Sequence, residues 1–459
     1  MMMPFARRAA ASLRLALAAL ALAVIAAQPA LAQSILRDAE TEALFDEMSA
    51  PLIAAAGLNP RNVKVVMIND KEINAFVAGG QIVYIHSGLL TAANNANEVQ
   101  GVVAHELGHV AGGHVIRINE GIKTATGITL LSLLVGVAAI AAGAGDVGAG
   151  IMAAGQQAAL GKFLAFTRTQ ESSADQAGRS YMAKAGISGR GLISFFKKLQ
   201  GIEFRLSIPQ DDSYGRTHPL SGERVSILEE QMRSDPAWSK PTDPALEARF
   251  QRVKAKLKGF IEQPAQVLND FPESNGAIPA RYARAYAWHR SAYPEKALAE
   301  TDALLKAVPG DPYFLELKGQ ILLESGRPSE ALPILREAVT RTNAQPLISA
   351  LFGHALIATE DSANFDEAAR VLRAAVAKDN ENPFAWYQLG VVFDRQGDAA
   401  RAAMASAERY HLEGRPRLAL ANAEIAVRNL PQGTPDWIRA QDIAMVSKTA
   451  VDDEKRKRR

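Results

Sequence analysis

The spacing of hydrophobic and polar residues divides this chain of 459 residues into a mixed first half and a helical second half. Residues 34–56 carry apolar side chains at helical spacing, and Gly57 and Pro60 end that predicted helix. Three short runs rich in β-branched residues follow and predict strands: 63–68, 73–77 and 82–85. Because Gly79 and Gly80 separate the last two runs, we expect a small sheet that contains a hairpin.

A helix is predicted next at residues 98–119, and it contains the pattern H-E-x-x-H. His105 and His109 are four residues apart, so they lie one turn apart on one helix face, where both rings can bind the same metal ion. Glu106 projects beside them and can act as a general base toward a water molecule. The pattern is typical of zinc metalloproteases, so one zinc ion per chain is the expected cofactor.

Such a zinc site needs a third protein ligand, and a second helix at 162–185 offers one. Glu171 and Asp175 lie four residues apart on one face of this helix. Glu171 is the candidate third ligand, and Asp175 is placed to accept the free ring N–H of a ligating histidine. An isolated pair of this kind is more often a solvated acidic face, but the upstream H-E-x-x-H favours the metal site.

Four further residues are accessory candidates. His218 stands in a T-H-P loop, where the following proline limits its backbone, and it could reach the cleft. Arg224 is a candidate for stabilising substrate or transition-state charge, or else a surface cation. Asn74 lies where an edge strand could pair with an extended substrate, and it either contacts that substrate or forms a turn or bulge. His114 misses the third-ligand position of the longer zinc motif by one, so we expect it to be structural and to point away from the metal.

A long uncharged run at residues 124–145, with a Leu/Val/Ala-rich core at 128–142, separates the two site helices. A weaker apolar segment follows at 147–160. Flanking glycines and many alanines favour a helical hairpin that covers the active-site cleft or enters a membrane surface. The length also permits a transmembrane helix, and a core helix is the third interpretation.

Composition narrows the classes of function and location. The formal net charge is +2, and no basic stripe with interleaved aromatic residues predicts a nucleic-acid partner. The absence of cysteine excludes disulfides and cysteine-based zinc sites. Residues 1–32 have the basic, apolar and A-x-A parts of a signal peptide, so the mature chain would begin at Gln33 in a bacterial periplasm. An uncleaved membrane anchor is the alternative.

The second half is repetitive. Prolines and glycines recur together at intervals of 34 and 37 residues: Pro312, Pro346 and Pro383, and Gly319, Gly353 and Gly390. Residues 383–410 fit the W-x-x-L-G-x-x-Y…A pattern of tetratricopeptide repeats. We therefore expect a solenoid at 280–445 whose concave face binds peptides or proteins, preceded by a linker at 263–279 and followed by a charged tail at 446–459. A generic helical bundle is the alternative.

In combination, these motifs resemble the BepA-type periplasmic zinc metalloproteases of metallopeptidase family forty-eight, which are related to HtpX and the CAAX-processing proteases. The resemblance covers nearly the whole mature chain. It implies a mainly α architecture: an α+β, gluzincin-like protease domain with a small sheet at 33–262, then an α-solenoid. The implied site consists of the ligands His105, His109 and Glu171, the base Glu106, the supporting Asp175, and His218 as a possible fourth ligand that would keep the enzyme latent.

The resemblance also implies a place in the cell. The insert at 128–160 would be a lid or a membrane-associating element, and its length and apolarity depart from the family, which leaves peripheral or integral attachment open. The expected substrates are misfolded or stalled outer-membrane proteins, and the expected partner of the repeats is outer-membrane assembly machinery. Two alternatives remain: a repeat-based chaperone or scaffold for outer-membrane assembly, and an integral membrane protease.

Overall fold

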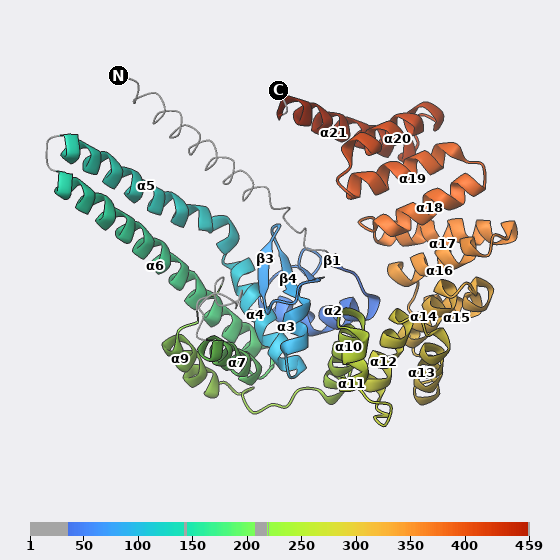
Figure 1. Ribbon diagram of the computed structural model, residues 1–459, viewed down its shortest axis with the longest axis horizontal. Helices are drawn as coiled ribbons and strands as arrows, with labels where there is room; N and C mark the ends of the chain where they lie inside the picture. The colour runs from blue at the N-terminus through green and yellow to red at the C-terminus, as the bar shows by residue number, and fades with distance from the viewer. Residues whose placement is uncertain (1–34, 142–144, 207–217, 219, 458–459) are drawn as a thin grey trace, which may run out of the picture.

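The computed structural model describes residues 35–141, 145–206, 218 and 220–457, and Figure 1 labels its elements. The predicted signal peptide, the expected first mature residue Gln33, and Thr217 and Pro219 of the T-H-P loop lie outside the described residues. The chain is mainly helical, with one small mixed sheet followed by a helical solenoid, which confirms the expected fold class.

A four-stranded sheet lies at the centre of the first half, in the order β1-β2-β4-β3. Its strands are β1 (Ile35–Leu36), β2 (Lys64–Ile68), β3 (Ala75–Ala78) and β4 (Ile82–His86). β2 runs parallel to β4, whereas β3 turns back through Gly79 and Gly80, both at positive φ, and pairs antiparallel with β4. β3 and β1 are therefore the two edge strands.

The first expected helix, 34–56, is wrong at its start. Residues 35 and 36 form β1 and pair antiparallel with β2. Helix α2 (Ala39–Ala55) begins only after Asp38, which has an extended backbone and whose side chain accepts a hydrogen bond from the backbone N–H of Thr41 at 2.8 Å. Two apolar residues fit a strand and a helix equally well, so the capping aspartate decides where the helix starts.

Helices enclose the sheet and make a single core with it. They are α3 (Ser87–Ala92), α4 (Ala96–Ala111), α7 (Arg190–Leu206), α9 (Gly222–Arg233) and α10 (Pro244–Ile261). Phe45 of α2, Ile85 of β4 and Val102 of α4 belong to the same buried cluster. A Cβ atom at Gly101 would lie only 2.7 Å from Leu192, so this glycine lets α4 and α7 pack closely. As a result α4 is buried along nearly its whole length, including its polar side chains.

Helices α5 (His114–Ala141) and α6 (Gly145–Ala185) form a long antiparallel hairpin that extends away from the body (Figure 1). Two glycines allow the close contact between these helices. A Cβ atom at Gly121 would lie 2.5 Å from the Phe166 ring, and a Cβ atom at Gly155 would lie 2.0 Å from Ser132. α6 also joins the segment at 147–160 to the helix expected at 162–185. The apolar insert is therefore a helical hairpin that continues directly into a site helix.

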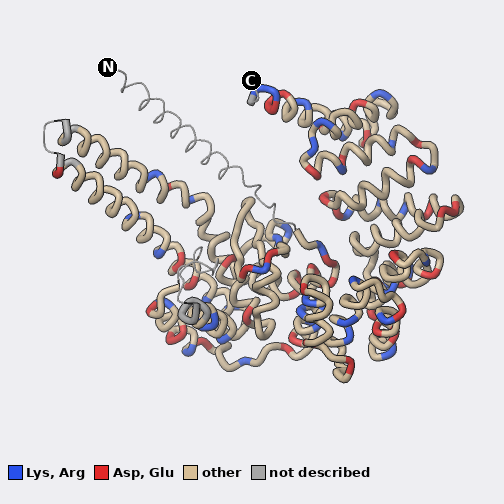
Figure 2. Tube along the Cα trace, viewed as in Figure 1, with Lys and Arg blue, Asp and Glu red and all other residues tan. Residues whose placement is uncertain are grey.

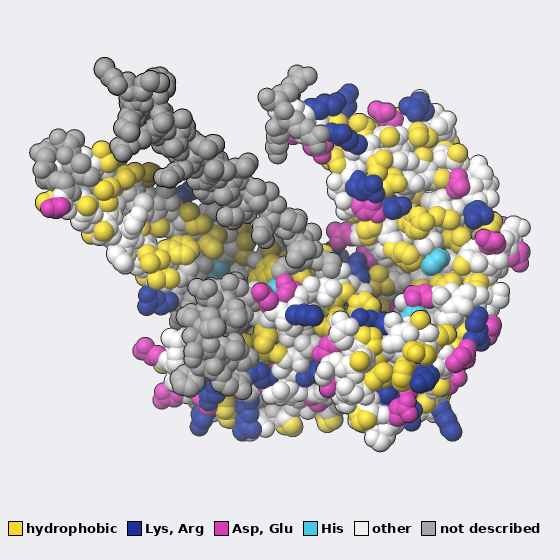
Figure 3. Space-filling model, in the orientation of Figure 1, with side chains coloured by type: hydrophobic (Ala, Val, Ile, Leu, Met, Phe, Trp, Pro, Cys, Tyr) yellow, Lys and Arg dark blue, Asp and Glu magenta, His cyan; other side chains and the backbone are white. Residues whose placement is uncertain are grey.

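The outer part of this hairpin exposes apolar side chains and few charges (Figures 2 and 3). Leu131 is 64% and Leu134 is 70% exposed, which is inconsistent with a core helix. The stretch His114–Val137 is long and apolar enough to cross a membrane, with a mean hydropathy of 1.3.

The second half is a stack of helix pairs, seen on the right of Figure 1. Most of these helices begin with proline at their first position. Its elements are α12 (Ile278–Arg290), α13 (Pro294–Ala307), α14 (Pro312–Glu324), α15 (Pro328–Arg341), α16 (Pro346–Ala358), η1 (Ser362–Asn364), α17 (Phe365–Lys378), α18 (Pro383–Arg395), α19 (Ala399–Leu412), α20 (Pro416–Asn429) and α21 (Pro435–Lys457). The expected linker contains the short helix α11 (Pro264–Asp270), and residues 446–457 of the expected tail belong to α21.

The repeated glycines have a packing role within the pairs. A Cβ atom at Gly319 would lie 2.4 Å from Leu335, and one at Gly353 would lie 2.5 Å from Leu372. In each pair a leucine of the second helix therefore fills the space that the glycine leaves on the first helix. At Gly390 the nearest atom to such a Cβ, the Ser406 Oγ, is 3.5 Å away, so this pair is less tight.

The solenoid curves so that its concave side faces the β1 edge of the sheet (Figure 1). Ion pairs join the two halves: Arg252 to Asp311 at 2.7 Å, Arg37 to Asp379 at 2.9 Å, and Lys64 to Glu381 at 2.9 Å. The Tyr282 hydroxyl also donates to Glu40 at 2.9 Å. These contacts fix the repeats against the edge of the sheet that is opposite β3.

Candidate active site and metal centre

The H-E-x-x-H helix α4 presents both of its histidines on one buried face. The Nε2 atoms of His105 and His109 lie 3.2 Å apart, and His105 is fully buried. Helix α6 crosses directly beside them, because a Cβ atom at Gly108 would lie 2.7 Å from the Ala174 carbonyl and one at Gly178 would lie 3.1 Å from Ala104. Small residues on both helices thus set the distance between the two sequence motifs.

Glu171 of α6 reaches the two histidines across this contact. Its carboxylate oxygens lie 3.5 Å from the Nε2 of His105 and 3.4 Å from the Nε2 of His109. Burial alone would raise the pKa of Glu171, but His218, His105 and His109 hold it well below its usual range. The carboxylate is therefore charged and directed at the two ring nitrogens, as expected for a third metal ligand.

His218 completes the group from the loop that precedes α9. Its Nδ1 lies 3.0 Å from Glu171 and 3.3 Å from the Nε2 of His105. Its Nε2 lies 3.3 Å from the carbonyl oxygen of Ala75 on the edge strand β3 and 3.5 Å from Glu106. His218 thus lies between the candidate ligands, the candidate base and the strand expected to receive a substrate.

This donor set fits a zinc-like ion. Ligand atoms of His105, His109, Glu171 and His218 all lie within 4.8 Å of one another, and all four residues are buried. Both carboxylate oxygens of the neighbouring Glu106 are buried and have no hydrogen-bond partner in the described part of the chain. Imidazole nitrogens with one carboxylate are the ligands of catalytic zinc sites, and buried polar atoms without partners are otherwise costly.

Asp175 supports His105 from behind. Its Oδ1 lies 3.0 Å from the Nδ1 of His105, on the opposite side of the ring from the metal group. Burial lowers the pKa of His105, but the hydrogen bonds to Asp175 and Glu171 outweigh this effect and raise it to about 10. Asp175 therefore has the placement expected for a residue that fixes the tautomer and orientation of a ligating histidine.

Arg224 of α9 lies inside the site and not on the surface. Its Nη2 is 3.1 Å from Glu171 and 3.0 Å from Asp175, and its Nε donates to Asp175. Its side chain is only 12% exposed. The guanidinium therefore bridges two carboxylates of α6, which is a role that neither expectation from the sequence included.

The His114 ring lies against His109, so the expectation that it points away, which assumed a continuous helix, is wrong; its place outside the metal group agrees with the expected structural role. The helix expected at 98–119 ends at Ala111, and Gly113 has a φ of +62° before α5 begins at His114. This break turns the His114 ring back, so that its Nδ1 lies 3.0 Å from the Nδ1 of His109. The glycine pair at 112 and 113 was the sequence signal for this turn.

Asn74 immediately precedes the edge strand β3 and is 6% exposed. Its carbonyl oxygen accepts a hydrogen bond from the backbone N–H of His86 at 3.0 Å, so its backbone belongs to the sheet. A cavity of about 490 Å³ lies on another side of the group, where Glu171, Asp175 and Arg224 meet apolar residues such as Leu164 and Ile227. This cavity lies between α6 and α9, and Glu171 is the member of the metal group that lines it.

Comparisons with known proteins agree with this arrangement of fold and site. The profile of Peptidase family M48 matches residues 6–232, and a tetratricopeptide-repeat profile matches residues 293–346 and 358–411. The chain is 26% identical over 388 residues to the beta-barrel assembly-enhancing protease of Yersinia pestis, covering 81% of this chain and 76% of that protein. It is 30% identical over 197 residues to the metalloprotease YcaL of Escherichia coli (strain K12), covering 41% of this chain and 71% of that protein.

Among solved structures, YrrB, a tetratricopeptide-repeat protein with an unusual peptide-binding site, aligns with 39% of this chain and 92% of its own at 21% identity and a TM-score of 0.31. The peptidase fold and its buried histidine–carboxylate group define the chain as a metalloendopeptidase that also carries tetratricopeptide repeats. The chain belongs to Peptidase family M48.

Proposed function

We propose that this metalloendopeptidase uses one zinc ion to hydrolyse peptide bonds in misfolded or stalled outer-membrane proteins, in the periplasm. The observation that carries the proposal is the buried convergence of His105, His109, Glu171 and His218 beside the unbonded carboxylate of Glu106. Support for the substrate class comes from the relative in Yersinia pestis, which is named a beta-barrel assembly-enhancing protease.

In this proposal His105, His109 and Glu171 hold the ion. When bound, zinc supplies Lewis-acid polarisation of the scissile carbonyl and makes the attacking water more acidic. Glu106 accepts the proton of that water and delivers it to the nitrogen of the leaving amine. The absence of a hydrogen-bond partner for either oxygen of Glu106 within the described residues supports this role, because neither oxygen is held by a structural hydrogen bond.

The edge strand β3 receives the substrate. An extended chain can add to its free side by backbone hydrogen bonds, next to Asn74 and beside the metal group. His218 contacts the carbonyl oxygen of Ala75 on this strand and also contacts Glu106 and Glu171. We infer that His218 is a latch, which takes the fourth ligand position and the strand carbonyl together and must leave before a substrate binds.

Peripheral contact with a membrane is the proposed role of the α5–α6 hairpin. Its exposed leucines and its projection from the body support membrane association over a lid on the cleft (Figures 1 and 3). An integral protease remains the alternative, since one stretch is long enough to span. The repeats would bind outer-membrane assembly machinery. The alternative function is a scaffold protein in which the zinc ion has only a structural role.

The test is cleavage of casein, an unfolded protein, by the chain beginning at Gln33, beside its Glu106→Gln variant. Glu120→Gln is the matched control, because this glutamate is exposed on α5. We expect the wild type and the control to cleave casein, and both the Glu106→Gln variant and chelated wild type to be inactive. Cleavage by Glu106→Gln at the wild-type rate would overturn the assignment of the base. A silent wild type that stays silent as His218→Ala would favour the scaffold.

A further inference from the structure

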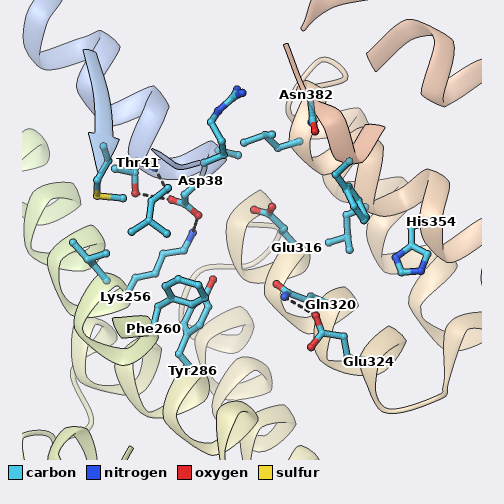
Figure 4. Close-up of a pocket in the computed structure, with 18 of the residues that line it drawn as sticks. Asp38, Thr41, Lys256, Phe260, Tyr286, Glu316, Gln320, Glu324, His354 and Asn382 are labelled. Carbon is cyan, nitrogen blue, oxygen red and sulfur yellow. Dashed lines mark hydrogen bonds and ion pairs between the residues drawn. The ribbon is translucent and has the colours of Figure 1, made fainter. Parts of the chain in front are cut away.

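A cavity of about 690 Å³ lies between the first half of the chain and the concave side of the solenoid (Figure 4). The first half lines it with residues of β1, α2 and α10, and the solenoid lines it with the first helices of successive pairs, α12, α14, α16 and α18. The cavity adjoins the β1 edge of the sheet, whereas the metal group adjoins the β3 edge. No residue of the metal group lines the cavity, so the two sites are separate.

Glu316 of α14 directs its carboxyl group into this cavity from the solenoid side (Figure 4). Its Oε2 atom is buried and has no hydrogen-bond partner in the described part of the chain. Burial raises the pKa of this carboxyl to about 8, and the nearby Lys256 only partly opposes the effect. A buried carboxyl oxygen without a hydrogen-bond partner is unfavourable for folding, which indicates a function outside the solenoid's own packing.

The other charged groups around the cavity are already paired. Lys256 lies 2.5 Å from Asp38 and 3.3 Å from Glu40, as the dashed line from Asp38 shows for the first pair (Figure 4). Arg37 pairs with Asp379 at 2.9 Å and with Glu42.

The remaining carboxyl group of the lining, Glu324, lies 2.8 Å from the Nε2 of His289 and accepts a hydrogen bond from Gln320 at 2.8 Å. Among the described residues that line the cavity, Glu316 is thus the carboxyl without a charged partner. A single cation would complement the ionised Glu316 carboxyl, and both cations among the described lining residues, Arg37 and Lys256, are already paired.

Apolar side chains surround this carboxyl. Leu323, Leu351 and Phe384 line the cavity on the solenoid side, and Phe384 is 43% exposed although it lies on the inner face. Leu36 and Phe260 line it from the first half. An occupant that fits must therefore present apolar side chains next to one positive group, which is the chemistry of a peptide with a basic residue between apolar ones.

We propose that this cavity binds an apolar segment of another protein through one lysine or arginine side chain, which pairs with Glu316. The flanking apolar side chains of that segment pack against Leu351 and Phe384. This inference goes beyond the peptidase function, because the site would hold a partner or a substrate at a distance from the catalytic group and requires no chemistry there.

Fluorescence anisotropy tests the proposal with a short labelled peptide that has blocked ends and one central lysine flanked by leucines. Two companion peptides carry norleucine or glutamate in place of the lysine. The protein is the full chain from Gln33 with Glu106→Gln, so that the peptide is not cleaved. Binding is measured at about pH 9, where the Glu316 carboxyl is ionised and the peptide lysine is still charged. We expect the lysine peptide to bind about tenfold more tightly than the norleucine peptide, and the glutamate peptide to bind least, since an ion pair with a desolvated carboxylate contributes about one factor of ten or more.

Three further variants locate the preference. Glu316→Gln has the same shape and should bind the lysine and norleucine peptides equally. Gln320→Lys places an ammonium group one helical turn from Glu316. This ammonium group should pair with Glu316 in place of the peptide lysine, so the preference for the lysine peptide should again be lost. Glu337→Gln, exposed on α15 outside the cavity, should keep the wild-type preference. Equal binding of the lysine and norleucine peptides by the wild type, no binding of either, or a preference that survives Glu316→Gln would each overturn the proposal.

Discussion

The Nδ1 of His109 lies 3.0 Å from the Nδ1 of His114, across the break between α4 and α5. Burial and the neighbouring His109 lower the pKa of His114 to about 4, so the His114 ring is neutral and can accept the N–H of His109. Each of the two helix histidines thus has a partner behind it, Asp175 for His105 and His114 for His109. The hairpin that begins at His114 is therefore joined to the metal group by a direct side-chain contact.

Replacing His114 should weaken metal binding. In His114→Ala the His109 ring loses the acceptor that fixes its tautomer, and the affinity for zinc should fall by roughly ten- to a hundredfold. His114→Gln, which retains an acceptor oxygen, should lose less. Competition with a chromophoric chelator measures the affinity, and His411→Ala on α19 is the control. If His114→Ala bound zinc as tightly as the control, the contact would be packing alone.

Arg224 should be a positioning residue whose shape matters as much as its charge. Arg224→Lys keeps a positive charge but cannot bridge Glu171 and Asp175 with a planar fork. We expect about a tenfold loss of zinc affinity and a lower kcat, with little change in KM for a peptide substrate. Arg179→Lys is the control, because Arg179 on α6 makes a similar two-point ion pair with Asp235, outside the metal group. A rise in KM alone would instead indicate contact with the substrate.

The glycines of the repeats should differ in their tolerance of a methyl group. Gly353→Ala would place a Cβ atom 2.5 Å from Leu372 and should lower the free energy of unfolding by about 1–3 kcal/mol. Gly390→Ala has its nearest contact at 3.5 Å and should be neutral or slightly stabilising, since alanine favours the helix. Thermal unfolding of both variants measures the difference. Equal destabilisation of the two variants would show that these glycines are not required for close packing of the helices within each pair.

The stability of the protein should depend on pH through Glu316. Burial raises its pKa from 4.5 to about 8, so between these values the folded chain retains a proton that the unfolded chain has released. The free energy of unfolding therefore falls as the pH rises through this window, and the loss is complete above about pH 8. Glu316→Gln lacks this dependence and should be more stable than wild type at about pH 9, by a few kcal/mol at most, and closer to it at about pH 5. A constant difference in Tm across the window would show that Glu316 is solvated.

The hairpin should bind membranes through its exposed leucines. Leu134→Glu puts a charge at a side chain that is 70% exposed and should reduce flotation with phosphatidylglycerol-containing vesicles by about tenfold. Met445→Glu, at a side chain that is 66% exposed on α21, is the matched control. Carbonate extraction of the wild type separates the two modes of attachment, since a peripheral protein is released and an integral one is retained. Equal flotation of both variants would exclude the hairpin as the contact.

The sequence by itself determined the features that depend on local spacing. The H-E-x-x-H pattern put His105 and His109 on one face because the helix repeats every 3.6 residues, and the recurring prolines and glycines gave the period of the solenoid. The same local information placed β2, β3 and β4 nearly at their observed bounds. It also predicted Glu171, because a zinc site with two ligands on one helix requires a third from elsewhere.

Only the tertiary structure decided what depends on contacts between distant segments. Arg224 meets Glu171 because α9 packs beside α6, and His114 reaches His109 because a positive-φ glycine reverses the chain between two helices. Glu316 has no charged partner among the described residues because Lys256, which lines the same cavity, is paired with Asp38 and Glu40 of the first half. Charge pairing and burial are properties of neighbours in space, so no pattern along the chain could assign them.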